Sequence, residues 1–324
     1  MRALDAVGER SEAAIGELAA AGETGAPLEG IEASVQRDNL AGVTYAALAY
    51  IFWGVVPIYW RWLANVPPFQ ITVHRVLWCA LFVAAVSFAR GRIPHLLALV
   101  RNTRILATLA LTSVLISINW LIYIYCVASD QLVEASLGYY IVPLLSIALS
   151  VAFYGERLSR LRLVAVVLAG AAVILKTLDV GHIPWIAPEL ALSFGFYGYF
   201  RKRANVDAMD GLTIETLILF PVTLVLVLYW NLSGTGAFRG TTAAADALLI
   251  FGGPLTAVPL AMFAAGARRI RLSTLGFLQY LAPSITLTLA IFGFGEGFTP
   301  LDAVTFGCVW AALLIVAAEG RLRR

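Results

Sequence analysis

PLLSIALSVAFYGERLSRLRLVAVVLAGAAVIL, residues 143–175, and PSITLTLAIFGFGEGFTPLDAVTFGCVWAALLI, residues 283–315, align without a gap. In each stretch a proline is followed by twelve residues, then a glutamate (Glu156 or Glu296), then a second apolar run. The matched residues include proline, glycine and glutamate as well as apolar ones, so we interpret the match as a duplication. A membrane protein built of two related halves is typical of a transporter whose site lies between them.

The composition indicates a membrane protein with many spans. Of 324 residues, 60% are hydrophobic and 13% are charged, against about half and about a quarter in soluble domains. The net charge of +3 is small and the basic residues lie in short loops, which favours membrane topology over nucleic-acid binding. The three cysteines are scattered through apolar runs without metal-ligand or disulfide spacing. We therefore predict no metal and no cofactor.

The apolar runs predict an all-α polytopic fold. A bilayer core of roughly 30 Å needs about 20 apolar residues per helix, and ten runs qualify. Residues 1–38 lack the apolar segment of a signal peptide and are predicted to form a disordered cytoplasmic tail. Residues 39–178 and 179–324 form the two predicted five-helix repeats. The predicted spans are 41–60, 69–89, 105–127, 132–154, 161–178, 183–200, 212–230, 246–267, 272–294 and 301–319.

The distribution of Lys and Arg predicts the orientation. With the N-terminus inside, 19 basic residues fall on the cytoplasmic side and three, Arg61, Lys176 and Arg239, fall outside. The remaining one, Arg75, lies within a span, where it either snorkels to the headgroups or faces the bundle. This asymmetry predicts a multi-pass protein of the inner (plasma) membrane with both termini in the cytoplasm.

The repeat and the orientation together predict inverted halves. The copies begin 140 residues apart, five spans on, and an odd number of spans reverses the direction of the chain. Glu156 is thus expected at the cytoplasmic face and Glu296 at the outer face. Two inverted halves provide two conformations open to opposite sides, which is the basis of alternating access.

Backbone breaks within apolar sequence predict hinges around a cavity. Pro143 and Pro283 lie near the middles of the predicted fourth and ninth spans, and Pro254 and Pro259 interrupt the eighth. Each proline removes a backbone donor and bends its helix. The alternative for each is a simple packing kink.

Four polar side chains within spans are candidates for the cavity. His74 follows Gln70 at helical spacing, titrates near neutral pH and is predicted to face the bundle. Glu134 either complements a helix dipole or binds an amine or a proton. Glu215 is either a partner of Arg201, Lys202 or Arg203 or part of the site. The fourth is Asn119, which lies opposite the breaks of the eighth span in the repeat alignment.

Aromatic residues form a second set of candidates, because their rings can stack on an aromatic or cationic ligand. The alternative is a lipid-facing or interfacial position. The set lies on the spans that carry the repeat signals or the breaks, and the buried amide beside Tyr280 belongs with it. Its members are Trp53, Trp120, Tyr139, Tyr140, Tyr197, Gln279 and Tyr280.

The chain resembles the RarD group of the EamA-type drug/metabolite transporter family. The matching segments are His74–Trp78, Asn119–Leu121, Glu134–Tyr139, Gly155–Arg157, Ser193–Gly198, Ile214–Thr216, Arg271–Phe277 and Gln279–Tyr280. The likeness covers residues 40–318. It implies ten helices in two inverted repeats, the fifth and tenth at the periphery, transport without ATP and a link to chloramphenicol sensitivity. No binding residue is carried over from it.

A transporter, an intramembrane enzyme and a sensor are the three classes of function considered for this sequence. A secondary transporter of small metabolites or drugs accounts for the repeat, the breaks and the polar residues together, and an exporter of amino acids or aromatic metabolites is the alternative cargo class. An intramembrane enzyme is remote, because the sequence has no metalloprotease, nucleophile-elbow or Walker A motif. A sensor usually has a soluble domain. The predicted partners are a small molecule, the bilayer and a proton or other coupling ion, with the oligomeric state left open.

Overall fold

The computed structural model describes residues 28–154, 159–180, 185–270, 274–275 and 278–322, and these contain helices and no strands. Most of the N-terminal tail and the Gly155–Glu156 turn lie outside the described residues. The helices are α2 (Leu28–Arg61), α3 (Pro68–Ala89), α4 (Ile93–Arg101), α5 (Thr103–Ala128), α6 (Leu132–Tyr154), α7 (Arg160–Val180), α8 (Ile186–Ala204), α9 (Ala208–Ser233), α10 (Ala243–Ala267), α12 (Leu281–Thr288), the π-helix η1 (Leu289–Gly293) and α13 (Pro300–Leu322).

Five described helices are long and apolar enough to cross a membrane: α3, α5, α9, α10 and the Gln36–Arg61 part of α2. Shorter apolar stretches lie in α6, α7, α12 with η1, and α13. The chain is therefore a multi-pass membrane protein. Described helices occupy each predicted span at least in part, while the count of ten crossings remains a prediction.

The structure differs from the sequence predictions in three places. α2 begins at Leu28, so the last part of the predicted tail is helical. The predicted loop 90–104 contains α4, whose Leu96 packs with Leu109 and Ile214; burial of one apolar face stabilises a short helix there. The predicted ninth span is not one α-helix, because α12 passes into the π-helix η1.

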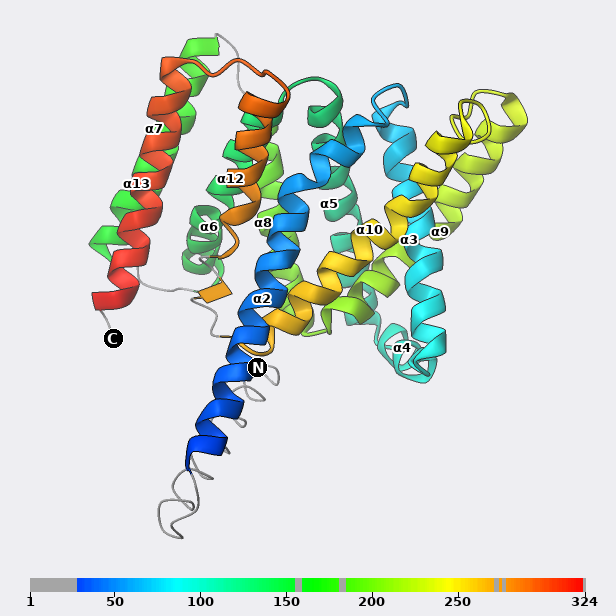
Figure 1. The fold of residues 1–324 in the computed structure, drawn as a ribbon, viewed down its shortest axis with the longest axis horizontal. Helices are drawn as coiled ribbons and strands as arrows, with labels where there is room; N and C mark the ends of the chain where they lie inside the picture. Colours follow the sequence, from blue (N-terminus) through cyan, green and yellow to red (C-terminus); the bar gives the residue numbers. More distant parts are fainter. Residues whose placement is uncertain (1–27, 155–158, 181–184, 271–273, 276–277, 323–324) are drawn as a thin grey trace.

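The helices pack side by side in one bundle (Figure 1). α7 and α13 pack on each other at one edge, and α6, α8 and α12 come next. Other contacts join α2 to α12 and α10, α3 to α9 and α10, and α5 to α8 and α9. The start of α2, the end of α13 and α4 lie at the same end of the bundle (Figure 1).

Glycine permits the closest of these contacts. A Cβ on Gly253 of α10 would lie 2.4 Å from the backbone carbon of Trp78 in α3. A Cβ on Gly138 of α6 would lie 2.9 Å from the carbonyl oxygen of Ala187 in α8. Small residues let helix backbones approach in a membrane, where van der Waals packing drives association.

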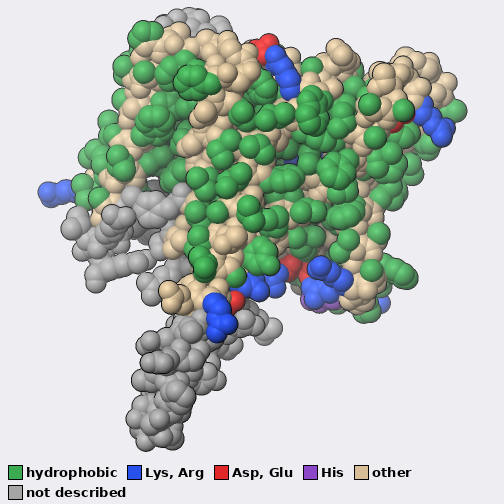
Figure 2. Space-filling model, viewed as in Figure 1, with side chains coloured by type: hydrophobic (Ala, Val, Ile, Leu, Met, Phe, Trp, Pro, Cys, Tyr) green, Lys and Arg blue, Asp and Glu red, His purple; other side chains and the backbone are tan. Residues whose placement is uncertain are grey.

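The charges are concentrated at the two ends of the bundle and the flank is apolar (Figure 2). Arg92 pairs with Asp210 at the α4 end, and Arg269 pairs with Asp38 at 3.1 Å. At the opposite end Arg61 pairs with Asp130 at 2.5 Å. This separation is expected of a protein whose flank is covered by lipid.

The turn before α13 contains a capping box. The Thr299 hydroxyl donates to Asp302 Oδ2 at 2.8 Å, and the Asp302 amide donates to Thr299 Oγ1 at 3.1 Å. Glu296 caps a different helix, because its carboxylate accepts the amides of Leu132 and Val133, each at 2.9 Å. Burial raises the pKa of the Glu296 carboxyl, and these two amides act against that rise.

Candidate functional site

A basic side chain lies among aromatic rings in the middle of the bundle. Arg75 of α3 donates through Nε to the Thr256 hydroxyl of α10 at 2.9 Å. Its guanidinium carbon lies 4.1 Å from the ring centroid of Trp120 in α5 and 5.2 Å from that of Trp60 in α2. We call Arg75, Trp60, Trp120 and Thr256 the arginine site. The snorkelling alternative is thus wrong, since the guanidinium turns toward three neighbouring helices.

The charge of Arg75 has no acidic partner in the part of the chain that the structure describes. The groups that interact electrostatically with it are the Tyr123 and Tyr139 hydroxyls and the Cys79 thiol, which ordinarily lose their protons above neutral pH. Arg at the centre of a membrane helix costs about 2.5–3.5 kcal/mol on insertion scales. Contact with two indole rings offsets part of that cost.

A hydrogen-bonded chain crosses from α6 to α8 beside the arginine site. The Tyr139 hydroxyl donates to Asn119 Oδ1 at 2.9 Å. Asn119 Nδ2 donates to the Ser193 hydroxyl at 3.0 Å and to the Leu190 carbonyl at 3.2 Å. The Asn119 amide is buried and all its polar atoms have partners, which fixes the orientation of both residues.

A second charged group, Glu215 of α9, is fully paired. Its Oε1 accepts the Thr112 hydroxyl at 2.6 Å and lies 3.5 Å from Arg201 Nε, while its Oε2 accepts the Tyr197 hydroxyl at 3.4 Å. We call Glu215, Arg201, Thr112 and Tyr197 the glutamate site. The predicted pairing with the Arg201–Arg203 segment is confirmed at Arg201.

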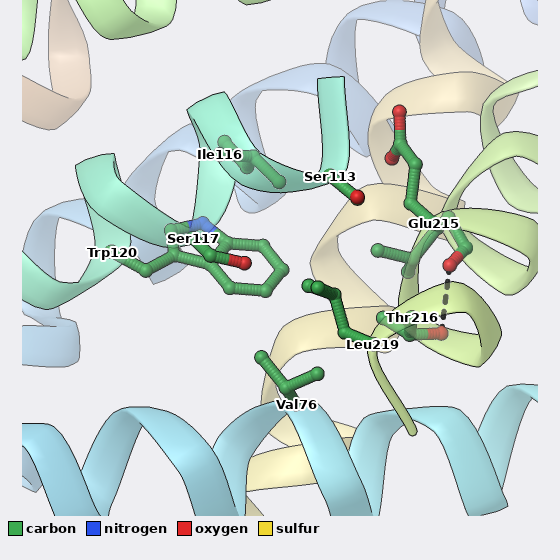
Figure 3. A pocket seen from close by; sticks show the side chains of 9 residues that line it. Val76, Ser113, Ile116, Ser117, Trp120, Glu215, Thr216 and Leu219 are labelled. Atoms are coloured by element: carbon green, nitrogen blue, oxygen red, sulfur yellow. Dashed lines mark hydrogen bonds between the residues drawn. The ribbon is translucent and has the colours of Figure 1, made fainter. Parts of the chain in front are cut away.

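A small pocket lies between the two sites. Trp120 and Ile116 of α5 face Leu219 of α9 across it (Figure 3). The carboxylate of Glu215 points away from Val76, the wall formed by α3. No water-sized sphere fits in the space between its walls. The lining is Val76, Ser113, Ile116, Ser117, Trp120, Leu212, Glu215, Thr216 and Leu219.

The walls of the pocket are largely apolar with a few hydroxyls. The Thr216 hydroxyl is used within its own helix, donating to the Leu212 carbonyl at 2.8 Å (Figure 3). The buried Ser117 hydroxyl has no hydrogen-bond partner among the described residues. An apolar pocket with a few polar groups suits a small organic molecule.

His74, a predicted cavity residue, lies outside the arginine site, the glutamate site and the pocket. His74 is buried against Phe238, 5.4 Å between ring centroids, in the segment that joins α9 to α10. Gln70, one turn earlier, holds the same segment: its side chain accepts the Ala237 amide at 2.7 Å and donates to the Thr235 carbonyl at 3.1 Å. His74 thus faces the bundle as predicted, but both His74 and Gln70 contact the connection between α9 and α10.

Further candidates lie in packing clusters at the sides. Trp53 of α2 packs with Tyr50 and Phe263. Tyr140 stacks on Tyr280 at 6.1 Å between ring centroids, close to α13. The structure therefore does not bring these rings into the central pocket.

The two remaining polar candidates also lie apart. Glu134 lies in the first turn of α6, as the helix-dipole alternative predicts. Its carboxylate also accepts the Ala187 amide of α8 at 3.4 Å. Gln279 is half-buried just before α12.

The prolines divide into two kinds. Pro143 lies inside α6, and Pro254 and Pro259 lie inside α10, as predicted. Pro283 was misplaced by the sequence: it lies in the first turn of α12, where a missing amide leaves no helical bond unmade. Its predicted position in the middle of a helix was therefore wrong, while its role as a hinge stays a prediction.

Arg75 is the central residue that the candidate set omitted. The signal was present in the charge count, because Arg75 is the one basic residue left inside a span when all others are assigned to a side. What the sequence lacked was the direction of the side chain. A permanently charged fork beside indole faces can bind a planar anion or stack on an aromatic group.

Comparison with known proteins identifies related chains. The sequence profile described as the EamA-like transporter family matches residues 40–178. YojE of Bacillus subtilis, named an uncharacterized transporter, is 44% identical over 86% of this chain and 94% of its own length. Protein RarD of Escherichia coli is 39% identical over 87% of this chain and 96% of its own length.

Two further likenesses extend the comparison. The chloramphenicol-sensitive protein RarD of Pseudomonas aeruginosa is 30% identical over 86% of this chain and 94% of its own. One solved crystal structure superposes with a TM-score of 0.55 at 18% identity, covering 86% of this chain and 98% of that one. At this identity the structural likeness concerns the fold alone.

Proposed function

The chain belongs to the EamA-like transporter family, with relatives named RarD, and we propose that it is a secondary transporter working by alternating access. Its cargo on this proposal is a small metabolite or drug that enters the central pocket. The protein lies in the plasma membrane with both termini in the cytoplasm. Its two halves, residues 39–178 and 179–324, are inverted relative to each other.

One observation carries the proposal: the pocket is lined from both predicted halves. Residues of α3 and α5, including Trp120, come from the first half, and residues of α9, including Glu215, come from the second. In transporters built of inverted repeats, the site lies at the interface of the repeats near the middle of the membrane. A rocking motion of one half against the other would open such a pocket.

The pairing of helices supports the inverted repeat. Exchanging α2, α3, α5, α6 and α7 for α8, α9, α10, α12 and α13, in that order, maps the contact of α6 with α8 onto that of α12 with α2. It likewise maps α10–α3 onto α5–α9 and α10–α2 onto α5–α8. The contacts α3–α9, α7–α13 and α6–α12 map onto themselves. A two-fold relation between the halves predicts this pattern.

The cargo and the driving gradient are proposed from the relatives' names and from the sequence. One relative carries chloramphenicol sensitivity in its name, so chloramphenicol is one candidate, and amino acids or aromatic metabolites are the others. With no ATP-binding motif in the sequence, a proton or other ion gradient is the proposed drive. His74, Glu134 and Glu215 are the titratable groups within helices that are proposed to couple it.

The orientation is tested first, by accessibility of single cysteines. Arg157→Cys and Gly297→Cys, in a background without Cys79, Cys126 and Cys308, place thiols just after the two repeat glutamates. We expect a membrane-impermeant maleimide to label the first from the cytoplasm and the second from outside. Labelling of both from one face would refute the inverted halves.

Transport is tested in proteoliposomes with chloramphenicol, amino acids and aromatic metabolites. We expect saturable uptake of at least one of them. Proton coupling predicts that an imposed pH gradient changes the rate, and that His74→Ala, Glu134→Gln or Glu215→Gln removes the change. Saturable uptake at a rate that the pH gradient does not change would rule out proton coupling, and it would still support the transporter proposal.

A further inference from the structure

The arginine site holds a cation without an anion. Arg75 is positively charged at every physiological pH, and none of its contacts in the described part of the chain is a carboxylate. Three other arginines differ: Arg61, Arg92 and Arg201 each face an acidic residue. An intramembrane charge of this kind marks a substrate or ion pathway by default.

The guanidinium also keeps donors free. Nε is used by the Thr256 hydroxyl at 2.9 Å. The two terminal nitrogens donate no hydrogen bond to any described residue. Arginine presents paired N–H groups in a fixed fork that matches the two oxygens of a carboxylate. A carboxylate would therefore meet both an unused charge and unused donors.

The surroundings suit an organic acid better than an inorganic anion. Trp120 lies under the guanidinium and also lines the apolar pocket, so the two spaces share one indole ring. Ile116, Leu219 and Val76 supply apolar walls there (Figure 3). The Tyr123 and Tyr139 hydroxyls lie within electrostatic range of the guanidinium.

We propose that Arg75 binds the carboxylate of the cargo, and that the apolar or aromatic body of the same molecule lies along Trp120 in the pocket. This rests on the proposed transport function and names its substrate class as organic monocarboxylates. Glu215 contributes no second charge to the cargo, because Arg201 already neutralises it. When the pocket is empty, the two indole rings and the Thr256 hydroxyl take the place of the carboxylate.

The test uses the full chain in lipid nanodiscs and matched pairs of probes that differ only at the acidic group. The pairs are phenylacetate and phenylacetamide, indole-3-acetate and indole-3-acetamide, and hexanoate and hexanamide. A ligand of the folded state raises the melting temperature by mass action. We expect at least one carboxylate to raise it more than its amide does.

Variants assign the preference to Arg75. Arg75→Gln should abolish the difference between carboxylate and amide. Arg61→Gln, which removes the same charge from a site paired with Asp130 at the end of the bundle, should leave that difference unchanged. Arg75→Lys keeps the charge without the fork, and its Kd for the carboxylate should rise about tenfold. This variant also serves if Arg75→Gln fails to fold.

The contrary outcomes are separate from those of the transporter proposal. If no carboxylate exceeds its amide, or if the preference survives in Arg75→Gln, the inference is wrong even where the protein transports a neutral cargo. If both repeat glutamates label from one face, the inverted transporter is wrong, whatever the carboxylates do.

Discussion

Arg75 and Glu215 occupy matching places and have opposite surroundings. Arg75 lies seven residues after Pro68, the start of α3, and Glu215 lies seven residues after Ala208, the start of α9. α3 and α9 pack on each other. Glu215 has a cationic partner and two hydroxyl donors, whereas Arg75 has two indole rings and one hydroxyl acceptor.

The difference separates a charge that stabilises the fold from one that is available to a ligand. Glu215 is 1% exposed and its carboxylate points away from Val76 across the pocket (Figure 3). Its charge is neutralised within the protein, so a cargo would have to displace Arg201 to use it. The positive charge of Arg75 has no such competitor among the described residues. Equal depth in a helix therefore does not imply an equal role.

The largest expected effect is the loss of stability in Glu215→Gln. It leaves Arg201 without its anion, and breaking a buried ion pair from one side costs about 3 kcal/mol. Arg75→Gln should change the free energy of unfolding by less than about 1 kcal/mol, because the lost cation–π contacts are offset by removing a buried charge. Titration with SDS of both purified variants would measure the two free energies.

The control for this comparison removes both members of the pair. Glu215→Gln combined with Arg201→Gln leaves no unpaired charge, so the double variant should be more stable than Glu215→Gln alone. An Arg75→Gln variant as unstable as Glu215→Gln would mean that Arg75 is also structural, and the contrast between the two sites would fail.

A smaller loss of stability is expected when a substitution displaces Arg201 from Glu215. A Cβ on Gly211 would lie 2.0 Å from Arg201 Nη1 and 2.2 Å from its Cζ. Gly211→Ala should therefore push the guanidinium off Glu215 and lower the free energy of unfolding by about 1–2 kcal/mol, despite the better helix propensity of alanine.

Gly198 of α8 provides the matched control for Gly211→Ala. Nothing lies within 4 Å of a Cβ at Gly198, so Gly198→Ala should be neutral or stabilising by up to about 1 kcal/mol. Chemical unfolding of the two variants side by side measures the difference. Equal behaviour would show that Arg201 relaxes without loss, and that its pairing with Glu215 contributes little.

The smallest effects are expected from single hydroxyls. Tyr197→Phe removes a long hydrogen bond of 3.4 Å to Glu215, and Tyr139→Phe removes one of 2.9 Å to Asn119. Tyr139→Phe should cost about 1 kcal/mol, because it leaves a buried amide oxygen without its donor. Tyr197→Phe should cost about half as much, since Thr112 still donates to Glu215.

Measurement of Tm for the two phenylalanine variants checks their order. A larger loss in Tyr197→Phe than in Tyr139→Phe would reverse it. That result would indicate that the glutamate site depends on each of its donors and is the less well compensated of the two.

The sequence predicted many residues of the site, but it did not predict which side chains lie together. The sequence identified Asn119, Trp120, Tyr139, Tyr197 and Glu215 as candidates, and the structure brings these toward the pocket or its neighbouring networks. His74, Trp53 and Tyr140 had equally good local patterns and lie elsewhere. Residue type and helical spacing reveal that a side chain is unusual in lipid, but they do not reveal which neighbour it faces.

By itself, the sequence determined that this is an all-helical protein of the membrane. Long apolar runs have no other way to satisfy their backbone groups in lipid. Its prolines also indicated breaks in the spans, two of which lie inside α10. Only the tertiary structure decided that the charge of Glu215 is neutralised and that of Arg75 is not. That outcome depends on Arg201 and on Trp60 and Trp120, which reach the two charges from other helices. Such pairings arise from helix packing, and no local spacing along the chain encodes them.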